Sequence, residues 1–218
     1  MEDSLWALPE ITIRRISVSS MDNNVYLLTA RRSGAQVIID AADELPAIQG
    51  LLAAGQQDTD EGVQARLVAV ITTHSHWDHV RALAGLVEST GAMTVAGSLD
   101  AADIQVPTSA AVDHGDVGEF DGFSLEAIQL RGHTPGSIAL LYRTPDGPDH
   151  LFTGDSLFPD GVGNTGNDPE RFAQLFGDVS ERIFEVLPDE TLVHPGHGRG
   201  TSLGAERPKL VEWKARGW

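Results

Sequence analysis

The chain has 218 residues, no cysteine, and 32 Asp and Glu against 15 Lys and Arg, which gives a formal net charge of −17. This length suits a single domain spanning residues 1–218. The missing cysteine excludes disulfides, thiolate nucleophiles and cysteine-held zinc, so a cytoplasmic location is expected. The acidic balance argues against a nucleic-acid partner, and no apolar stretch approaches the roughly 18 residues that a membrane-spanning helix needs.

The first half of the chain predicts a hairpin followed by alternating strands and helices. Apolar or alternating segments predict strands at 11–17, 25–29, 35–40, 67–72 and 94–96. Helices are expected from Asp43, as the N-cap, to about residue 54, from about residue 79 to 90, and from near Ser98. The strand at 67–72 is apolar throughout, which is typical of a strand covered on both faces of its sheet.

The second half predicts four further strands and two helices. The strands are expected at 123–129, 138–142, 150–152 and 191–193, and the helices at 168–186 and 203–216. Strands in runs, with helices between and after them, indicate two sheets with helices on the outside.

Four metal-competent side chains directly follow the strand at 67–72, where residues 73–79 read Thr-His-Ser-His-Trp-Asp-His. His74 and His76 are two apart in an extended segment, so they project the same way and can hold one ion. Asp78 and His79 lie where the chain turns into a helix, and they can point past that ion toward a second. Such a pattern arises by chance on the order of once in 10⁶ start positions, so it predicts a metal site.

Three later segments each place a further candidate ligand at the end of a strand and beside glycine. They read Gly-His-Thr-Pro-Gly at 132–136, Thr-Gly-Asp-Ser at 153–156 and His-Pro-Gly-His-Gly at 194–198. Glycine lets the backbone approach closely or take a positive φ, which helps to aim the ligand inward. The candidate metal ligands are then His74, His76, Asp78, His79, His133, Asp155 and His197. Seven ligands are too many for one zinc ion and suit two ions that share a carboxylate.

These motifs carry a resemblance over residues 11 to 213, nearly the whole chain. The sequence resembles the metallo-β-lactamase-fold hydrolases and is most similar to short single-domain members of the glyoxalase II (hydroxyacylglutathione hydrolase) group. The resemblance implies an α/β (α+β) fold, a four-layer αββα sandwich with the metals at one edge between the sheets. It also implies a first metal held by His74, His76 and His133 and a second held by Asp78, His79 and His197, with Asp155 bridging both.

A site of this kind makes a hydroxide nucleophile between two divalent ions at neutral pH. The sequence lacks a Gly-x-Ser-x-Gly motif, so a covalent acyl-enzyme is not expected. We therefore expect a hydrolase that cleaves a small acyl thioester, with Asp78 and Asp155 as catalytic carboxylates. Zinc is the expected metal, although iron or manganese suits the same ligands.

Two departures from glyoxalase II bear on the substrate. Full-length members carry a C-terminal helical region with basic groups for glutathione, for which no counterpart is expected after His197. Asn164 stands where many relatives have an arginine. A thiol carrier other than glutathione is therefore an alternative.

Other functions share parts of this pattern. A persulfide dioxygenase-like enzyme would hold one iron through His74, His133 and Asp155, and a lactonase would use all seven ligands. A true β-lactamase and a nuclease fit less well, because one β-lactamase subclass needs a cysteine ligand, another lacks an acid at the position of Asp155, and the nucleases have basic surfaces.

Among the remaining residues, His194 is a candidate for orienting a metal-bound imidazole, His114 and His150 are expected to be structural, and Trp77 either walls the substrate mouth or packs internally.

Overall fold

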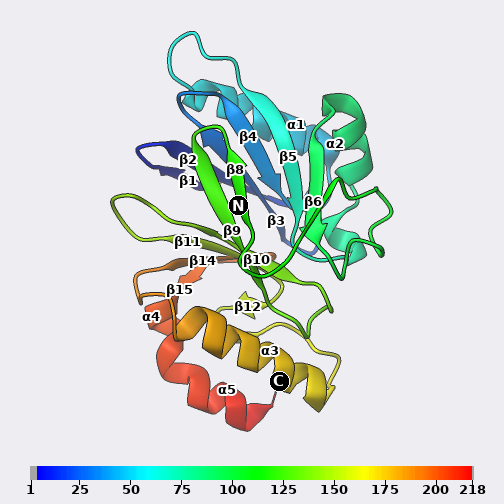
Figure 1. The fold of residues 1–218 in the computed structure, drawn as a ribbon, viewed down its shortest axis with the longest axis vertical. Helices are drawn as coiled ribbons and strands as arrows, with labels where there is room; N and C mark the ends of the chain where they lie inside the picture. The colour runs from blue at the N-terminus through cyan, green and yellow to red at the C-terminus, as the bar shows by residue number, and fades with distance from the viewer. Residues whose placement is uncertain (1–3, 218) are drawn as a thin grey trace.

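The computed structural model describes residues 4–217, so residues 1–3 and Trp218, at the ends of the predicted domain, lie outside the described residues. Two β-sheets pack against each other, and helices cover the outer face of each sheet (Figure 1). This is the four-layer αββα sandwich expected from the sequence. Among the described residues, no helix has the length and apolar character needed to cross a membrane.

The first sheet contains seven strands that lie side by side in chain order. They are β1 (Ser4–Ala7), β2 (Ile11–Val18), β3 (Asn23–Ala30), β4 (Ala35–Ile39), β5 (Arg66–Thr72), β6 (Met93–Gly97) and β7 (Ala110–Val112). The pairs from β1 to β4 are antiparallel and those from β4 to β7 are parallel. Helices α1 (Leu45–Gly55) and α2 (Leu83–Thr90) lie on its outer face, and a short 3₁₀ helix, η1 (Gln56–Asp58), follows α1.

The second sheet contains six strands, in which only β11 and β14 run parallel. In spatial order they are β15 (Thr201–Ser202), β14 (Leu192–Pro195), β11 (His150–Gly154), β10 (Ile138–Tyr142), β9 (Phe123–Gln129) and β8 (Val117–Phe120). The chain covers this sheet with α3 (Pro169–Val179), the π-helical turn η3 (Ser180–Phe184), α4 (Leu203–Glu206), η4 (Arg207–Lys209) and α5 (Leu210–Arg216). A small hairpin of β12 (Leu157–Phe158) and β13 (Gly161–Val162) lies beside them.

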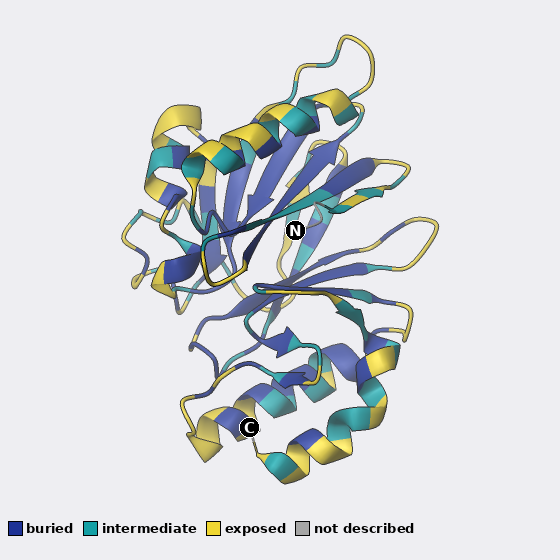
Figure 2. Cartoon of the chain, turned by 180° about the vertical axis from the view of Figure 1, so that it is seen from behind, coloured by how far each residue is buried: buried dark blue, intermediate teal, exposed yellow. Residues whose placement is uncertain are grey.

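Three apolar clusters hold the layers together. One fills the space between the sheets, and the other two lie between each sheet and its helices. Figure 2 shows the result, with buried strands inside and helices whose exposed residues face outward. Burial of one Leu, Ile or Phe side chain contributes about 1.5–3 kcal/mol, so these clusters are the main stabilising feature of the fold.

Several predicted elements are confirmed, and four helix predictions need correction. The helix expected from residue 79 is a one-turn 3₁₀ helix, η2 (Trp77–His79), and α2 begins only at Leu83. The reason is a tertiary contact, because the N–H groups of Arg81 and Ala82 donate to the carbonyls of Ala42 and Ala41 instead of forming helical bonds. The helix expected near Ser98 is a series of turns.

The N-cap of α1 also differs from the prediction. Glu44, with φ of 52°, takes the cap position without a side-chain hydrogen bond, whereas Asp43 pairs with Arg81. The last predicted helix is divided into α4, η4 and α5, since Pro208 lacks the N–H that a continuous helix would use. The sequence reading also missed β1, β7, β8, β12, β13 and β15, which have two to four residues each.

Candidate metal centre

The seven predicted ligands come together at one end of the sandwich, although they belong to four separate parts of the chain. His74 and His76 follow β5, Asp78 and His79 lie in η2, His133 lies in the β9–β10 loop, Asp155 follows β11, and His197 follows β14. The strands β9, β11 and β14 run in the same direction, so their carboxyl ends meet at one edge of the second sheet. The packing of the first sheet against the second brings the loop after β5 to the same edge.

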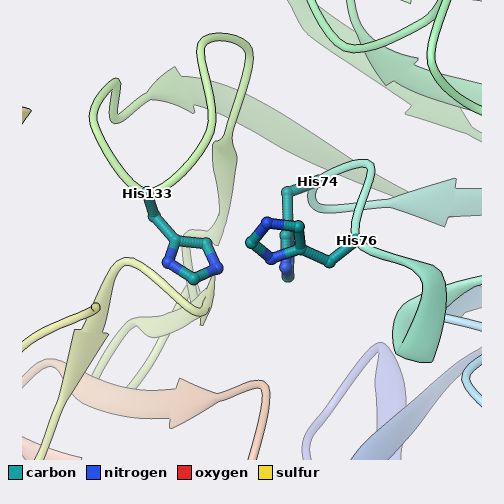
Figure 3. Close-up of side chains that lie close together, drawn as sticks. All are labelled: His74, His76 and His133. Atoms are coloured by element: carbon teal, nitrogen blue, oxygen red, sulfur yellow. The ribbon is translucent and has the colours of Figure 1, made fainter. Parts of the chain in front are cut away.

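The first donor set consists of His74, His76 and His133, whose rings converge on one point (Figure 3). One nitrogen of each ring lies within 4.8 Å of one nitrogen of the others. His74 and His133 are buried, and their Nε2 atoms have no hydrogen-bond partner among the described residues. Buried polar atoms without a partner are uncommon in proteins, and a cation at this point would satisfy both.

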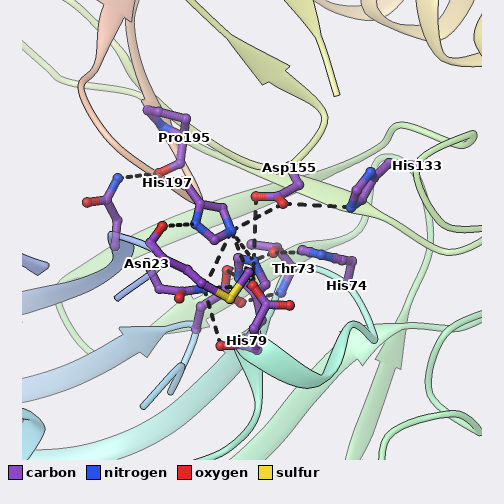
Figure 4. A network of polar contacts seen from close by, with 12 residues as sticks. Asn23, Thr73, His74, His79, His133, Asp155, Pro195 and His197 are labelled. Carbon is purple, nitrogen blue, oxygen red and sulfur yellow. Dashed lines mark hydrogen bonds and ion pairs between the residues drawn. The ribbon is translucent and has the colours of Figure 1, made fainter. Parts of the chain in front are cut away.

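The second donor set consists of Asp78, His79 and His197. Figure 4 shows His79 and His197 of this set beside Asp155. Asp78 Oδ2 lies 3.5 Å from His79 Nε2 and 3.3 Å from His197 Nε2, and the two nitrogens are 3.2 Å apart. Ligands about 2.0–2.1 Å from a tetrahedral ion are separated from one another by about 3.3–3.4 Å. The spacing of this set therefore fits a zinc-sized ion.

Asp155 lies between the two sets. Its Oδ1 is 3.5 Å from His79 Nε2, and its Oδ2 is 3.4 Å from His197 Nε2 and 3.7 Å from His133 Nε2. Together with His74 and His79 it forms a third group of donors within 4.8 Å of one another. This is the position that a carboxylate bridging two ions would need.

Four of the five imidazoles are oriented by an oxygen at Nδ1, which leaves Nε2 to face the site. His79 donates to Asp40 Oδ2 at 2.9 Å, His133 to the Asn164 carbonyl at 2.7 Å, His197 to the Met21 carbonyl at 2.8 Å, and His74 to Thr73 Oγ1 at 3.0 Å. Metal-binding histidines usually have such a partner, because it fixes the tautomer and the ring orientation. The loop residue Asn164 thus acts here through its backbone.

Asp40 and Asn23 support the site and were not among the predicted residues. Buried Asp40 accepts hydrogen bonds from the N–H and the hydroxyl of Thr73 at 2.7 and 2.8 Å, in addition to the one from His79. Asn23 donates through Nδ2 to Asp78 Oδ2 at 2.9 Å. A carboxylate at the end of the predicted strand 35–40 was a usable signal for Asp40, whereas nothing in the sequence marked Asn23.

Asp100 is a second buried carboxylate that the sequence reading missed. It accepts hydrogen bonds from the N–H of Ser75 at 2.8 Å, the N–H of Gly136 at 2.6 Å and Thr134 Oγ1 at 2.6 Å. Asp100 therefore ties the loop that carries His74 and His76 to the loop that carries His133.

Glycine is required at two positions beside Asp155. Gly154 has a φ of +48°, and a Cβ there would lie 2.4 Å from Thr73 Oγ1. At Gly196 a Cβ would lie 2.3 Å from Asp155 Oδ1 and 2.8 Å from His79 Cε1. The glycines of the motifs thus allow the two sheets to approach each other closely at the site.

The electrostatics of the two donor sets differ, and only the second set favours positive charge on its imidazoles. Burial alone would raise the pKa of the Asp155 carboxyl, but hydrogen bonds from His197 and His79 hold this pKa well below its usual range. Burial alone would lower the pKa of His79, but the carboxylates of Asp40 and Asp155 raise it to about 10. Burial lowers the pKa of His74 and of His133. In the absence of a metal ion, the second donor set holds a proton that a metal ion would replace.

His194, a candidate for orienting a metal-bound imidazole, has another partner in the structure. Its Nε2 lies 2.9 Å from Nδ1 of His150, the two ring planes are within 6° of parallel, and Trp6 lies edge-on against both rings. His150 is buried in this cluster and has the structural role expected for it. Trp77, in contrast, is 62% exposed, so internal packing does not explain it.

Comparison with known proteins supports this description. The metallo-β-lactamase superfamily profile matches residues 21–197. The hydroxyacylglutathione hydrolase of Rhizobium meliloti is 33% identical over 182 residues, which cover 81% of this chain and 62% of that protein. The chain thus spans less than two thirds of the length of that relative.

Two solved structures are also similar. ETHE1 from Myxococcus xanthus superposes with a TM-score of 0.77 and 27% identity, covering 93% of this chain and 84% of that one. TTHA1623, solved in a di-iron-bound form, superposes with a TM-score of 0.67 and 30% identity, covering 88% and 96% of the two chains. Because the matched residues 21–197 include all seven candidate ligands, and because the two-sheet fold agrees, the chain belongs to the metallo-β-lactamase superfamily.

Proposed function

We propose that this protein is a hydrolase that binds two divalent metal ions and cleaves a small acyl thioester. The observation that carries the proposal is the position of Asp155 between two sets of clustered donors, each of which could hold a metal ion. The likeness to a hydroxyacylglutathione hydrolase supports the thioester as substrate, and the likeness to a protein in a di-iron-bound form supports two ions.

The two ions would be held as the donor sets indicate. His74, His76 and His133 would hold the first, Asp78, His79 and His197 the second, and Asp155 both. The spacing of the second set is compatible with zinc, and iron or manganese would accept the same imidazole and carboxylate ligands. Two such ions, when bound, supply a hydroxide nucleophile at neutral pH and a Lewis acid for the substrate carbonyl.

The protein residues would orient the attacking water and supply negative charge to the bound ions. Asp155 is ionised at neutral pH because His197 and His79 stabilise its charged form. The pKa of Asp78 is also lowered, against the effect of burial, by the hydrogen bond from Asn23 and by His79. We assign to these two ionised carboxylates a catalytic role in which they accept hydrogen bonds from the attacking water and orient it. The chain has no cysteine to act as a covalent nucleophile instead.

The test is a comparison of four reactions by the purified, metal-loaded protein. These are thiol release from a panel of hydroxyacyl thioesters, lactone opening, β-lactam opening and oxygen uptake on a persulfide. We expect thioester cleavage to be fastest and metal analysis to give two ions per chain. Lactone opening without thioester cleavage would replace the proposal with a lactonase, and inactivity in all four would contradict it.

A second candidate is a mononuclear iron enzyme that oxidises a persulfide. His133 Nε2 lies 3.7 Å from Asp155 Oδ2, and His74 shares a donor group with Asp155, so these three residues could hold one ion. The likeness to ETHE1 is compatible with this alternative. One equivalent of iron, together with oxygen uptake and no thioester cleavage, would establish it over the hydrolase.

A further inference from the structure

A large aromatic side chain stands exposed at the edge of the metal centre. Trp77 lies between His76 and Asp78, which belong to the two donor sets, and 62% of it is exposed. Tryptophan is among the largest apolar side chains and usually buries most of its surface. Its exposure at this position, in the short helix η2, indicates a surface that something else covers.

Arg81 covers one face of the Trp77 ring. Its guanidinium carbon lies 4.0 Å from the ring centroid. Asp43 accepts a hydrogen bond from Nη1 of Arg81 at 2.5 Å, and Nη2 lies 3.7 Å from the sulfur of Met21. The ring is therefore held from one side and open on the other, and the charge of Arg81 is compensated by that of Asp43. We refer to Met21, Asp43, Trp77 and Arg81 as the Trp77 rim.

The rim is joined to the second donor set through Met21. The carbonyl of Met21 accepts the hydrogen bond that orients His197, while its side chain, 44% exposed, contacts Arg81. A ligand on the rim would consequently lie beside the residues that hold the reacting group.

We propose that the Trp77 rim binds the uncharged, apolar acyl arm of the substrate and that Arg81 fixes the ring for this purpose. The inference rests on the proposed function, since it assigns a part of that substrate to a surface. The leaving thiolate is anionic, and a rim whose cation is already paired with Asp43 gives it little stabilisation. An acyl chain, in contrast, gains affinity from contact with an exposed indole face and a thioether.

The test measures how affinity depends on acyl-chain length. S-alkyl thioethers of N-acetylcysteamine, with chains of two to eight carbons, are uncharged probes that cannot be hydrolysed, and their binding is measured by calorimetry. For the metal-loaded protein we expect the dissociation constant to fall about two- to fourfold per added methylene over the first few carbons. In Trp77→Ala this dependence should nearly disappear, and Trp77→Phe should restore part of it.

Two further variants separate the rim from general effects. Arg81→Gln should weaken the chain-length dependence, because the ring loses the group that stacks on it. Val211→Ala, at a position in α5 that is 82% exposed, should leave the dependence unchanged. Metal analysis must give the same content for Trp77→Ala as for the parent protein, so that lost binding is not due to lost metal.

The outcomes distinguish the rim from the proposed function. An unchanged chain-length dependence in Trp77→Ala would overturn the inference even if thioesters are hydrolysed. A chain-length dependence that is lost in Trp77→Ala, in a protein that cleaves no thioester, would support the rim as an apolar binding surface and contradict the hydrolase.

Discussion

At the scale of single residues, two of the predicted ligands differ in how many metal ions they would bind. Asp155 lies within 3.4 to 3.7 Å of ligands from both donor sets, whereas His197 contacts the second set only. Substitutions at these two positions therefore separate a shared ligand from a local one.

We expect Asp155→Ala to lose both metal ions and His197→Ala to lose mainly the second. The reason is that Asp155 would contribute to each ion, while three imidazoles of the first set are independent of His197. Metal content after gel filtration, measured by mass spectrometry of the metals, checks this. Retention of two tightly bound ions by Asp155→Ala would show that it is not a bridge.

Asp100 allows a prediction for a residue that touches no metal ligand. In Asp100→Asn, one carboxylate oxygen becomes an NH₂ group that faces donors, so at least one of the hydrogen bonds from Ser75, Thr134 and Gly136 is lost. The expected loss in free energy of unfolding is about 1–3 kcal/mol, and metal affinity should fall about 10–100-fold. Urea unfolding and metal titration measure these two effects.

The matched control is Asp146→Asn in the exposed turn between β10 and β11, where neither quantity should change. If Asp100→Asn binds metal as tightly as the parent protein, the two loops hold their ligands without the link through Asp100.

At the scale of elements, the C-terminal helices pack on the second sheet, and the buried side chain of Trp213 is central to this packing. Trp213 of α5 is 1% exposed and packs edge-on against Phe184 of η3, with ring centroids 6.2 Å apart. It belongs to the apolar cluster between these helices and the second sheet. The sequence predicted a helix over residues 203–216, but not the division of that helix around Pro208.

Trp213→Ala should lower the free energy of unfolding by about 3–5 kcal/mol, since a large cavity would remain in a packed cluster. Val211→Ala on the same helix is the control, because Val211 is 82% exposed and its truncation should change stability little. Equal effects of the two substitutions in denaturant unfolding would mean that α5 does not pack on the sheet as described.

At the scale of the whole molecule, two buried histidines away from the metal centre make stability depend on pH. Burial lowers the pKa of His150 to about 4 and that of its partner His194 well below the usual value. The unfolded chain titrates these groups near pH 6.5, so below that pH it binds more protons than the folded chain. Their contribution to stability is therefore complete above about pH 6.5 and is lost as the pH falls toward 4.

His150→Gln should consequently lose less stability than the parent protein between pH 7.5 and pH 5. One titrating group changes the free energy of unfolding by at most about 1.4 kcal/mol per pH unit. Unfolding in urea with a chelator present measures it without interference from metal release at low pH. His114→Gln, on an exposed turn, should follow the parent protein. A parallel pH dependence in His150→Gln and the parent would contradict the role of the pair.

The sequence by itself determined the candidate ligands and most of the strands. His74, His76, His133, Asp155 and His197 could be found because each stands at the end of an apolar segment, and several stand beside a glycine that the close approach of the sheets requires. A strand that is buried on both faces, such as β5, is apolar throughout, so the local composition indicates where it lies.

Only the tertiary structure decided how these ligands are supported and what surrounds them. Asp40, Asp100 and Asn23 reach the site from strands and turns far along the chain, and their hydrogen bonds join segments 25 to 55 residues apart. The hydrogen bond from His197 to the carbonyl of Met21 also joins distant segments, since these two residues are 176 apart in the chain. The physical reason is that local composition records burial and backbone conformation, whereas the partner of a buried polar group is set by which distant segments the packed sheets bring together.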